Sequence, residues 1–371
     1  MNVKELNELR RRFKPEKTAI SRIYGCYVNS AKEIVAYLDE PLGTMGQEEQ
    51  EKYLGLLKKA LSGGLGKNLM DVVFTTRQVQ DSDEHRLLSA LRDSGLKDGE
   101  VRESFYRKVM DCLDMGDSGY LILLACDSYD VPRKDSSGES EEVFTYVISA
   151  LCPVKPTKPE LSFFPGDNEF RLQAPGYVAG NPELGFLFPA FDDRRANIYN
   201  ALYYSRNPDA IHQEFIDGVF HAEPPMSAAE QRETFRTVLT EALGEGCSLD
   251  VIQVVYDRFR SLLAEHKENK NPEVLTVSPE SVAQVLGECQ VEEEKVNTFL
   301  ALCGERFGEN VPLQPGNLID EGKFTISTET VSVALDAEQS YLAEARVIDG
   351  KKCLLIPMGD QAEVNGFQVR L

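Results

Sequence analysis

The chain has 371 residues, 42% of them hydrophobic, and its 61 acidic and 40 basic residues give a formal net charge of −21. This length predicts two or three packed units. The negative charge argues against a general nucleic-acid coat, because that kind of binding depends on lysine and arginine displacing phosphate counterions.

The distribution of apolar residues and cysteines predicts a cytoplasmic protein. No stretch approaches the roughly 20 consecutive apolar residues of a membrane span, and the segment MNVKELNELRRRF lacks the apolar region of a secretion signal. The eight cysteines include no Cys-x-x-Cys pair and lie mostly in apolar runs, which is typical of buried thiols in a reducing compartment. We therefore expect no membrane partner.

The first predicted element is an N-terminal helix with many basic side chains. Its apolar stripe is formed by Val3, Leu6, Leu9 and Phe13. Glu8 and Arg12 are spaced for an i,i+4 ion pair. We favour a solvated helix face over a nucleic-acid site. The residues kept as a secondary basic patch are Arg10, Arg11, Arg12 and Lys14.

Strands and helices then alternate up to about residue 185. SRIYGCYVNS and EIVAYLD have the pattern of neighbouring strands, and helices are predicted over 45–61 and 95–115. The apolar segments GYLILLACDSYDV and VFTYVISALCPV, joined by a polar loop, predict an antiparallel strand pair. Prolines 153, 156 and 159 predict an irregular stretch after this pair.

The last third of the chain predicts a helical module followed by strands. Ser227 and Gly244 bound one helix, a second spans 249–266, Ser278-Pro279 begins a third, and a fourth covers 292–307. KFTISTETVSVALD and ARVIDGKKCLLIPM predict strands, with Asp349-Gly350 as a hairpin turn.

These elements predict an α+β protein. We expect an N-terminal mixed or antiparallel sheet with helices, a helical middle module and a small C-terminal antiparallel β unit. The expected domains are 1–225, 226–310 and 311–371.

Two motifs resemble known sites but lack their essential parts. SGGLGKN, at 62–68, lacks the glycine spacing and the final Ser or Thr of a phosphate-binding loop, and a helix end with glycine caps is favoured. His221 and Glu223 have the His-x-Glu spacing of zinc deaminases, but no paired-cysteine segment follows. We assign no catalytic residue, no metal site and no cofactor.

The segment FPAFDDRRANIYNALYYSRN, at 188–207, is the strongest candidate site. Asp192 or Asp193 predicts the N-cap of a helix that runs through Asn197 to Ser205, but Arg194 and Arg195 would then lie in its first turn and oppose the helix dipole. Structural salt bridges are favoured over phosphate or partner binding, and both readings stay open. The candidate binding residues are Arg194, Arg195, Arg206, Tyr199, Tyr203, Asp192 and Asp193.

Nearly the whole chain resembles an uncharacterised domain-of-unknown-function family of Firmicutes. The segments that carry this resemblance are ELRRRFKPEKTAISRIYGCYV, LSGGLGKN, LLSALRDSGLKD, ACDSYDVP and ELGFLFPAFDDRRANIYNALYY. More distantly, the order of elements is similar to the nucleoid-associated protein family, in which two apolar strands precede a basic segment and an aromatic helix. Arg194 and Arg195 match that family's basic positions only loosely, and Asp192-Asp193 departs from its pattern.

The distant resemblance implies a non-enzymatic cytoplasmic factor of the nucleoid that acts through DNA or DNA-bound proteins. An enzyme acting on nucleotides or phosphate esters is one alternative. The other is a scaffold that presents acidic helices to a protein partner, which the net charge also suits. A homodimer is a further expectation.

Overall fold

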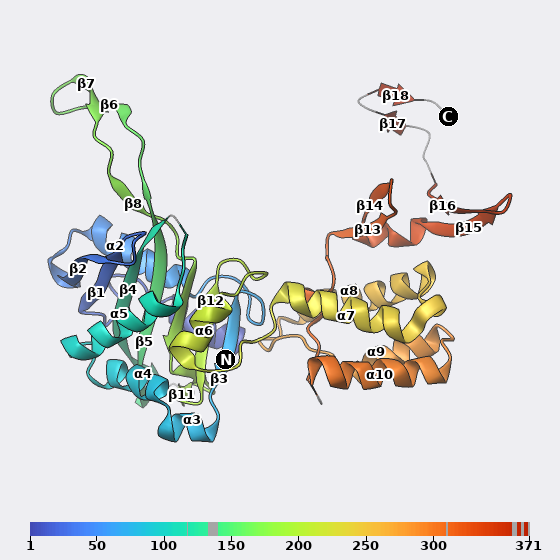
Figure 1. The fold of residues 1–371 in the computed structure, drawn as a ribbon, viewed down its shortest axis with the longest axis horizontal. Coiled ribbons are helices and arrows are strands. Elements are labelled where there is room, and N and C mark those ends of the chain that lie inside the picture. The colour runs from blue at the N-terminus through green and yellow to red at the C-terminus, as the bar shows by residue number, and fades with distance from the viewer. Residues whose placement is uncertain (117, 133–139, 309–310, 358–361, 365–366, 370–371) are drawn as a thin grey trace. The chain divides into compact units, whose positions relative to one another are not determined.

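The structure is a computed structural model that describes residues 1–116, 118–132, 140–308, 311–357, 362–364 and 367–369 (Figure 1). Its contacts divide the chain into two compact units, Met1–Ser227 and Ala228–Leu371. The further division of the second unit at residue 310 stays a prediction.

The first unit contains six helices and a 3-10 turn among its described residues. The helical segments are α1 (Val3–Arg10), η1 (Leu42–Thr44), α2 (Gln47–Lys59), α3 (Thr76–Asp81), α4 (Asp83–Asp93), α5 (Gly99–Cys112) and α6 (Gln213–Phe220). The strands before residue 157 are β1 (Arg22–Val28), β2 (Ile34–Pro41), β3 (Leu69–Val73), β4 (Gly119–Pro132) and β5 (Ser140–Pro156). The later strands are β6 (Glu160–Phe164), β7 (Glu169–Gln173), β8 (Tyr177–Ala179), β9 (Leu184–Phe188), β10 (Ala190–Asp192), β11 (Arg195–Asn197) and β12 (Asn200–Ser205).

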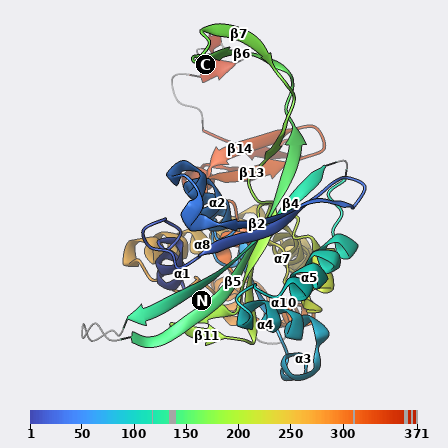
Figure 2. The same cartoon turned by 90° about the vertical axis from the view of Figure 1, so that its left-hand side faces the viewer.

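An antiparallel sheet organises this unit. Its strand order is β2-β1-β4-β5-β9-β12-β3, and β8 pairs with β5 beside this path. β4 and β5 are the long central strands (Figure 2), and their pairing runs from Gly119 opposite Val154 to Pro132 opposite Ser140. The predicted antiparallel pair is therefore confirmed. The polar loop predicted between its strands lies largely on 133–139, outside the described residues.

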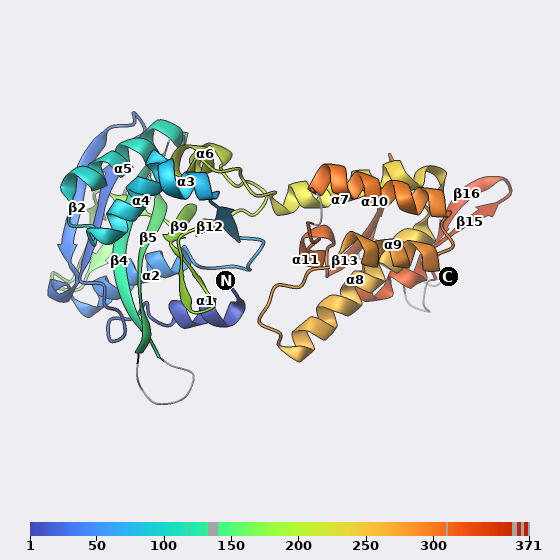
Figure 3. The ribbon, with the colours of Figure 1, turned by 90° about the horizontal axis from the view of Figure 1, so that it is seen from below.

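Helices cover both faces of the sheet because both faces are apolar. Figure 3 shows α4, α5 and α6 on one side and α1 and α2 on the other. The first core contains Leu88, Phe105 and Phe215 from the helices. The second contains Leu9 and Leu57, packed on the opposite sheet face. This two-sided burial explains why β4 and β5 are almost continuously apolar.

Two of the expectations for 153–205 are wrong. The stretch predicted as irregular begins inside β5, which includes Pro153 and ends at Pro156, and it continues with β6, β7 and β8. Pro159 immediately precedes β6, so the prolines do not prevent strand formation here. The helix predicted to follow Asp192-Asp193 and run to Ser205 is replaced by the β10–β11 hairpin and by β12. Asp193 and Arg194 have φ values of 48° and 61°, so they form the turn between β10 and β11 and do not begin a helix. Tyr203 and its neighbours pair with both β3 and β9, where aromatic side chains fit the sheet well.

The second unit follows the predicted order of helices and hairpins. Its helical segments are α7 (Ala228–Leu243), η2 (Gly244–Gly246), α8 (Leu249–Asn269), α9 (Pro279–Glu288), α10 (Glu293–Phe307), α11 (Pro315–Leu318) and η3 (Ala337–Leu342). Its strands are β13 (Lys323–Ser327), β14 (Ser332–Asp336), β15 (Glu344–Ile348), β16 (Lys351–Leu355), β17 (Ala362–Val364) and β18 (Phe367–Val369). The Ser278 hydroxyl caps α9 and Pro279 is its first residue, as predicted. Asp349 and Gly350 have positive φ and form the predicted hairpin turn.

An ion pair between α4 and α5 predicts an acid-dependent contribution to stability. The Lys108 Nζ lies 2.9 Å from the Glu84 Oε1, and the two side chains are 29% and 18% exposed. Burial alone would raise the pKa of Glu84. Hydrogen bonds from Lys108, the backbone and Ser82 instead lower this pKa from its ordinary value of 4.5 to about 2. The folded state therefore favours the ionised carboxylate, which stabilises the fold above about pH 4.5, and this contribution is lost as the pH falls towards 2.

We expect Glu84→Gln to lower the free energy of unfolding by about 2 kcal/mol at neutral pH, after allowance for solvent screening. Urea unfolding of both proteins checks this, and the difference should shrink to roughly half or less near pH 3. A difference that stays constant with pH would contradict the ionic explanation.

Candidate functional site

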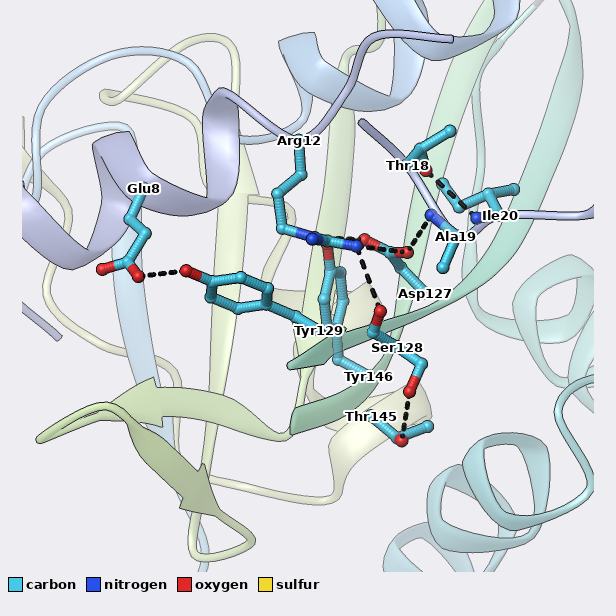
Figure 4. Close-up of polar contacts among 10 residues, drawn as sticks. All are labelled: Glu8, Arg12, Thr18, Ala19, Ile20, Asp127, Ser128, Tyr129, Thr145 and Tyr146. Atoms are coloured by element: carbon cyan, nitrogen blue, oxygen red, sulfur yellow. Dashed lines mark hydrogen bonds and ion pairs between the residues drawn. The ribbon is translucent and has the colours of Figure 1, made fainter. Parts of the chain in front are cut away.

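The two basic segments singled out in the sequence meet at one end of the first unit. α1 lies against β10, and the chain following α1 crosses β4. Figure 4 shows the side chains around Arg12 and Asp127 that belong to this contact region. This cluster, which we call the Asp127 network, consists of Glu8, Arg12, Asp127, Tyr129, Tyr146 and Arg194.

Asp127 is the centre of the network and is only 1% exposed. Arg12 Nε and Nη2 donate hydrogen bonds to its two carboxylate oxygens at 2.8 and 3.0 Å. The Tyr146 hydroxyl donates at 2.8 Å and the backbone N–H of Ala19 at 2.9 Å. A buried carboxylate is tolerated when it is paired and hydrogen-bonded in this way.

The pKa shifts in the network agree with this pairing. Burial alone would lower the pKa of Arg12, but the hydrogen bonds and charge of Asp127 raise it. Burial, and then the charge of Asp127, raise the pKa of Tyr146 well above its ordinary value. Both side chains therefore stay protonated and act as donors to the carboxylate.

The network continues from Arg12 to Arg194. The Arg12 guanidinium lies 4.5 Å from the centre of the Tyr129 ring, in cation–π geometry. The Tyr129 hydroxyl donates to Glu8 Oε1, and Arg194 Nη1 donates to Glu8 Oε2 at 2.7 Å. Arg194 Nη2 also donates to the Pro132 carbonyl at 2.8 Å. The sequence predicted an i,i+4 ion pair between Glu8 and Arg12. Instead, Glu8 binds Arg194 and Arg12 binds Asp127, because α1 ends at Arg10.

The other candidate residues of 192–206 do not form one surface site. Asp192 accepts a hydrogen bond from Asn197 at 2.7 Å, and Asp193 is an exposed turn residue. Tyr203 is fully buried, and its hydroxyl donates to the Ile211 carbonyl. Besides Asp193, the exposed side chains of the set are Tyr199, Arg195 and Arg206.

Both exposed arginines lie near carboxylates. Arg195 Nε lies 3.8 Å from Glu142 Oε2, and Arg206 Nη1 lies 3.8 Å from Glu183 Oε2. Exposed pairs at this distance are weak, so these two guanidiniums stay accessible to solvent.

The N-terminal basic patch is divided between structural and exposed residues. Arg10 donates to the carbonyls of Leu61 and Gly63 at 2.7 and 2.8 Å, beyond the end of α2. Arg11 and Lys14 are exposed. Gly63 has a φ of 85°, and the SGGLGKN segment is the glycine-containing turn between α2 and β3. The predicted helix end near this motif is therefore confirmed, but the predicted glycine caps are wrong, because α2 ends at Lys59 and its C-cap residue is Ala60.

A groove beside α2 is a second candidate site, and it was not predicted. Its volume is about 580 Å³. The groove is lined by Gly46, Glu48, Glu49, Lys52, Tyr53 and Leu56, together with Leu121 of β4 and Ala179 of β8.

The groove combines an apolar wall with acidic side chains. Tyr53, Leu56, Leu121 and Ala179 pack against the adjacent hydrophobic core but stay partly exposed. Glu48 and Glu49 are exposed in the first turn of α2, where carboxylates favour the helix dipole. Within the described part of the chain, neither side chain forms a hydrogen bond or ion pair with another residue. The groove can therefore accept an apolar side chain flanked by cations.

The described residues offer little for metal or nucleophilic chemistry. Among them, no group of three or more His, Cys, Asp and Glu side chains is arranged to hold a metal ion. All eight cysteines are free thiols, and Cys26, Cys152 and Cys303 are buried. Burial raises the pKa of each of these three thiols to about 12, which disfavours the reactive thiolate. No helix in the described ranges is long and apolar enough to span a bilayer.

These features define an α+β protein whose first unit carries a buried ionic network and an acidic, partly apolar groove. Residues 1–367 match the model of a family described as a domain of unknown function, DUF4317, and the chain belongs to this family. No curated protein matches the chain.

Proposed function

We propose that this protein is a non-enzymatic factor that binds a basic protein partner through the groove beside α2. The observation that carries this proposal is the combination of partly exposed Tyr53 and Leu56 with Glu48 and Glu49, whose side chains form no hydrogen bond or ion pair within the described residues. Such a surface complements a peptide segment in which leucine or a similar residue lies between lysines or arginines.

The charge of the chain supports a basic partner over direct binding to nucleic acid. A net charge of −21 attracts cationic proteins and repels phosphate. Arg12 and Arg194 are held by Asp127 and Glu8, so they are poor candidates for phosphate contacts. Arg195 and Arg206 are more exposed, and direct DNA contact through them is the alternative that the experiment below tests.

The distant resemblance in element order to the nucleoid-associated protein family supports a DNA-bound protein as the basic partner. We therefore propose that the protein acts in the bacterial nucleoid, and the nearer resemblance supports Firmicutes as its source. Many DNA-binding proteins present lysine and arginine, so an acidic factor can associate with the nucleoid without contacting phosphate itself.

The test is fluorescence anisotropy of a short labelled peptide of leucines and lysines, titrated with the purified full chain at several salt concentrations. We expect Glu49→Lys to weaken binding about tenfold, which corresponds to about 1.4 kcal/mol. Glu51→Lys is the matched control, because it makes the same charge change on the exposed surface of α2 outside the groove lining. A peptide with serines in place of leucines keeps its charge and should bind weakly.

If Glu49→Lys and Glu51→Lys weakened peptide binding equally, the effect would be one of non-specific charge, and this would contradict binding in the groove. Labelled duplex DNA is titrated in parallel with wild type and with the Arg195→Ala, Arg206→Ala double variant. DNA binding that has a negative log-log salt slope and is lost in the double variant would replace this proposal with direct phosphate contact.

A further inference from the structure

The hairpin of β6 and β7 is an arm that projects from the ends of β5 and β8, away from the sheet of its unit (Figure 1, Figure 2). Leu161 pairs with Leu172 and Phe163 pairs with Phe170. Cross-strand partners share a face, and side chains two residues apart on a strand also share a face. These four large apolar side chains therefore lie on one side of the arm, which we call the apolar arm face.

The apolar arm face is open to solvent. Leu161, Phe163, Phe170 and Leu172 are 69%, 46%, 66% and 70% exposed. The ring centres of Phe163 and Phe170 are 5.1 Å apart, so the two rings contact each other. Within the described residues, none of the four belongs to the buried clusters of either unit.

On the opposite face of the arm, polar side chains form hydrogen bonds and ion pairs with other residues of the arm. The Ser162 hydroxyl donates to Gln173 Oε1 at 2.9 Å. Arg171 forms an ion pair with Asp167, and its guanidinium lies 4.8 Å from the centre of the Phe164 ring. An isolated two-stranded ribbon is marginally stable in water. An exposed row of apolar side chains on such a ribbon therefore indicates an interaction surface that another surface covers.

We propose that the apolar arm face binds the same face of a second copy of this chain, forming a twofold dimer. The row of leucine and phenylalanine pairs is self-complementary, as a twofold contact requires.

Charge favours a second copy at this place. Residues 155–178 contain three basic residues, Lys155, Lys158 and Arg171, and three acidic ones, Glu160, Asp167 and Glu169. The arm is therefore neutral in a chain of net charge −21, and two copies repel each other least where their arms meet. The arm has no excess of carboxylates that would attract a cationic partner. In this respect it differs from the groove beside α2.

The area of the apolar arm face predicts a weak dimer. Phenylalanine and leucine side chains exposed to these extents offer roughly 500 Å² per copy, or roughly 1,000 Å² in total. This total lies at the lower end of specific interfaces. The dimer should therefore dissociate on dilution.

Sedimentation velocity of the full chain over a wide concentration range tests the proposal. The wild-type mass should rise from that of one chain, 41.5 kDa, towards twice that value as concentration increases. Phe163→Ser with Phe170→Ser should keep the chain monomeric at every concentration. Leu161→Ser with Leu172→Ser is the second variant, and circular dichroism checks that both variants keep the wild-type fold.

Val347→Ser is the matched control, since Val347 is 70% exposed on the β15–β16 hairpin of the second unit. It should leave the concentration dependence unchanged. A wild-type chain that stays monomeric throughout, or a dimer that both serine variants retain, overturns the proposal. Flotation of the wild type with phosphatidylcholine vesicles, lost in the arm variants, would assign the face to lipid and also overturn it.

Discussion

Replacing Asp127 with alanine should lower the free energy of unfolding of the first unit by about 3–5 kcal/mol. The substitution removes the acceptor of hydrogen bonds from Arg12, Tyr146 and the Ala19 N–H. The Arg12 side chain is 14% exposed, so its charge would remain largely out of water without a counterion. An unpaired buried charge and an unsatisfied tyrosine hydroxyl cost more than the loss of a surface pair.

Urea unfolding followed by tyrosine fluorescence measures this effect. The chain has no tryptophan, and all its tyrosines except Tyr256 and Tyr341 lie in the first unit, so the signal reports mainly on that unit. Asp130→Ala is the control, because Asp130 is an exposed carboxylate on the same strand. Its expected effect is within about 0.5 kcal/mol. A similar decrease in the free energy of unfolding in the two variants would mean that Asp127 has no special structural role.

The parts of the fold that the sequence predicted are those set by local signals. Ser278-Pro279 and Asp349-Gly350 specify a helix start and a hairpin turn through their own backbone preferences. At 192–205 a local signal was misleading. Asp192-Asp193 resembles an N-cap. The conformation of β12, however, is determined by β3 and β9, which pair with it on either side, and a single sequence does not show these neighbours.

The candidate site was predicted in its components but not in its arrangement. The basic residues were identified, yet Arg12 and Asp127 are 115 positions apart, and only the pairing of strands brings them together. One signal was available, since Asp127 interrupts an apolar strand in which an unpaired charge would be costly. The groove gave no comparable signal, because Leu121 and Ala179 come from two strands far from α2 in sequence.

Replacing Gly185 with alanine should lower the free energy of unfolding of the first unit by about 3 kcal/mol, the upper part of the usual range for overpacking. A Cβ atom at this position would lie 2.4 Å from the Ser149 carbonyl oxygen and 2.9 Å from the Ala60 Cβ. The first contact is with the backbone of β5, which its partner strands hold in place. The second is with Ala60, the C-cap residue of α2. Relief of both contacts therefore requires β9 to shift relative to β5 and α2 to move away from the sheet.

Gly55→Ala, in the middle of α2, is the matched control and should have the opposite sign. A Cβ atom there meets nothing within 4 Å. Alanine should therefore raise the free energy of unfolding by about 0.5–1 kcal/mol through helix propensity. Urea unfolding of both variants gives the comparison, and a neutral Gly185→Ala would show that α2 is not seated tightly on β9. Because α2 also forms one wall of the groove, Gly185→Ala should weaken binding of the leucine–lysine peptide while Gly55→Ala preserves it.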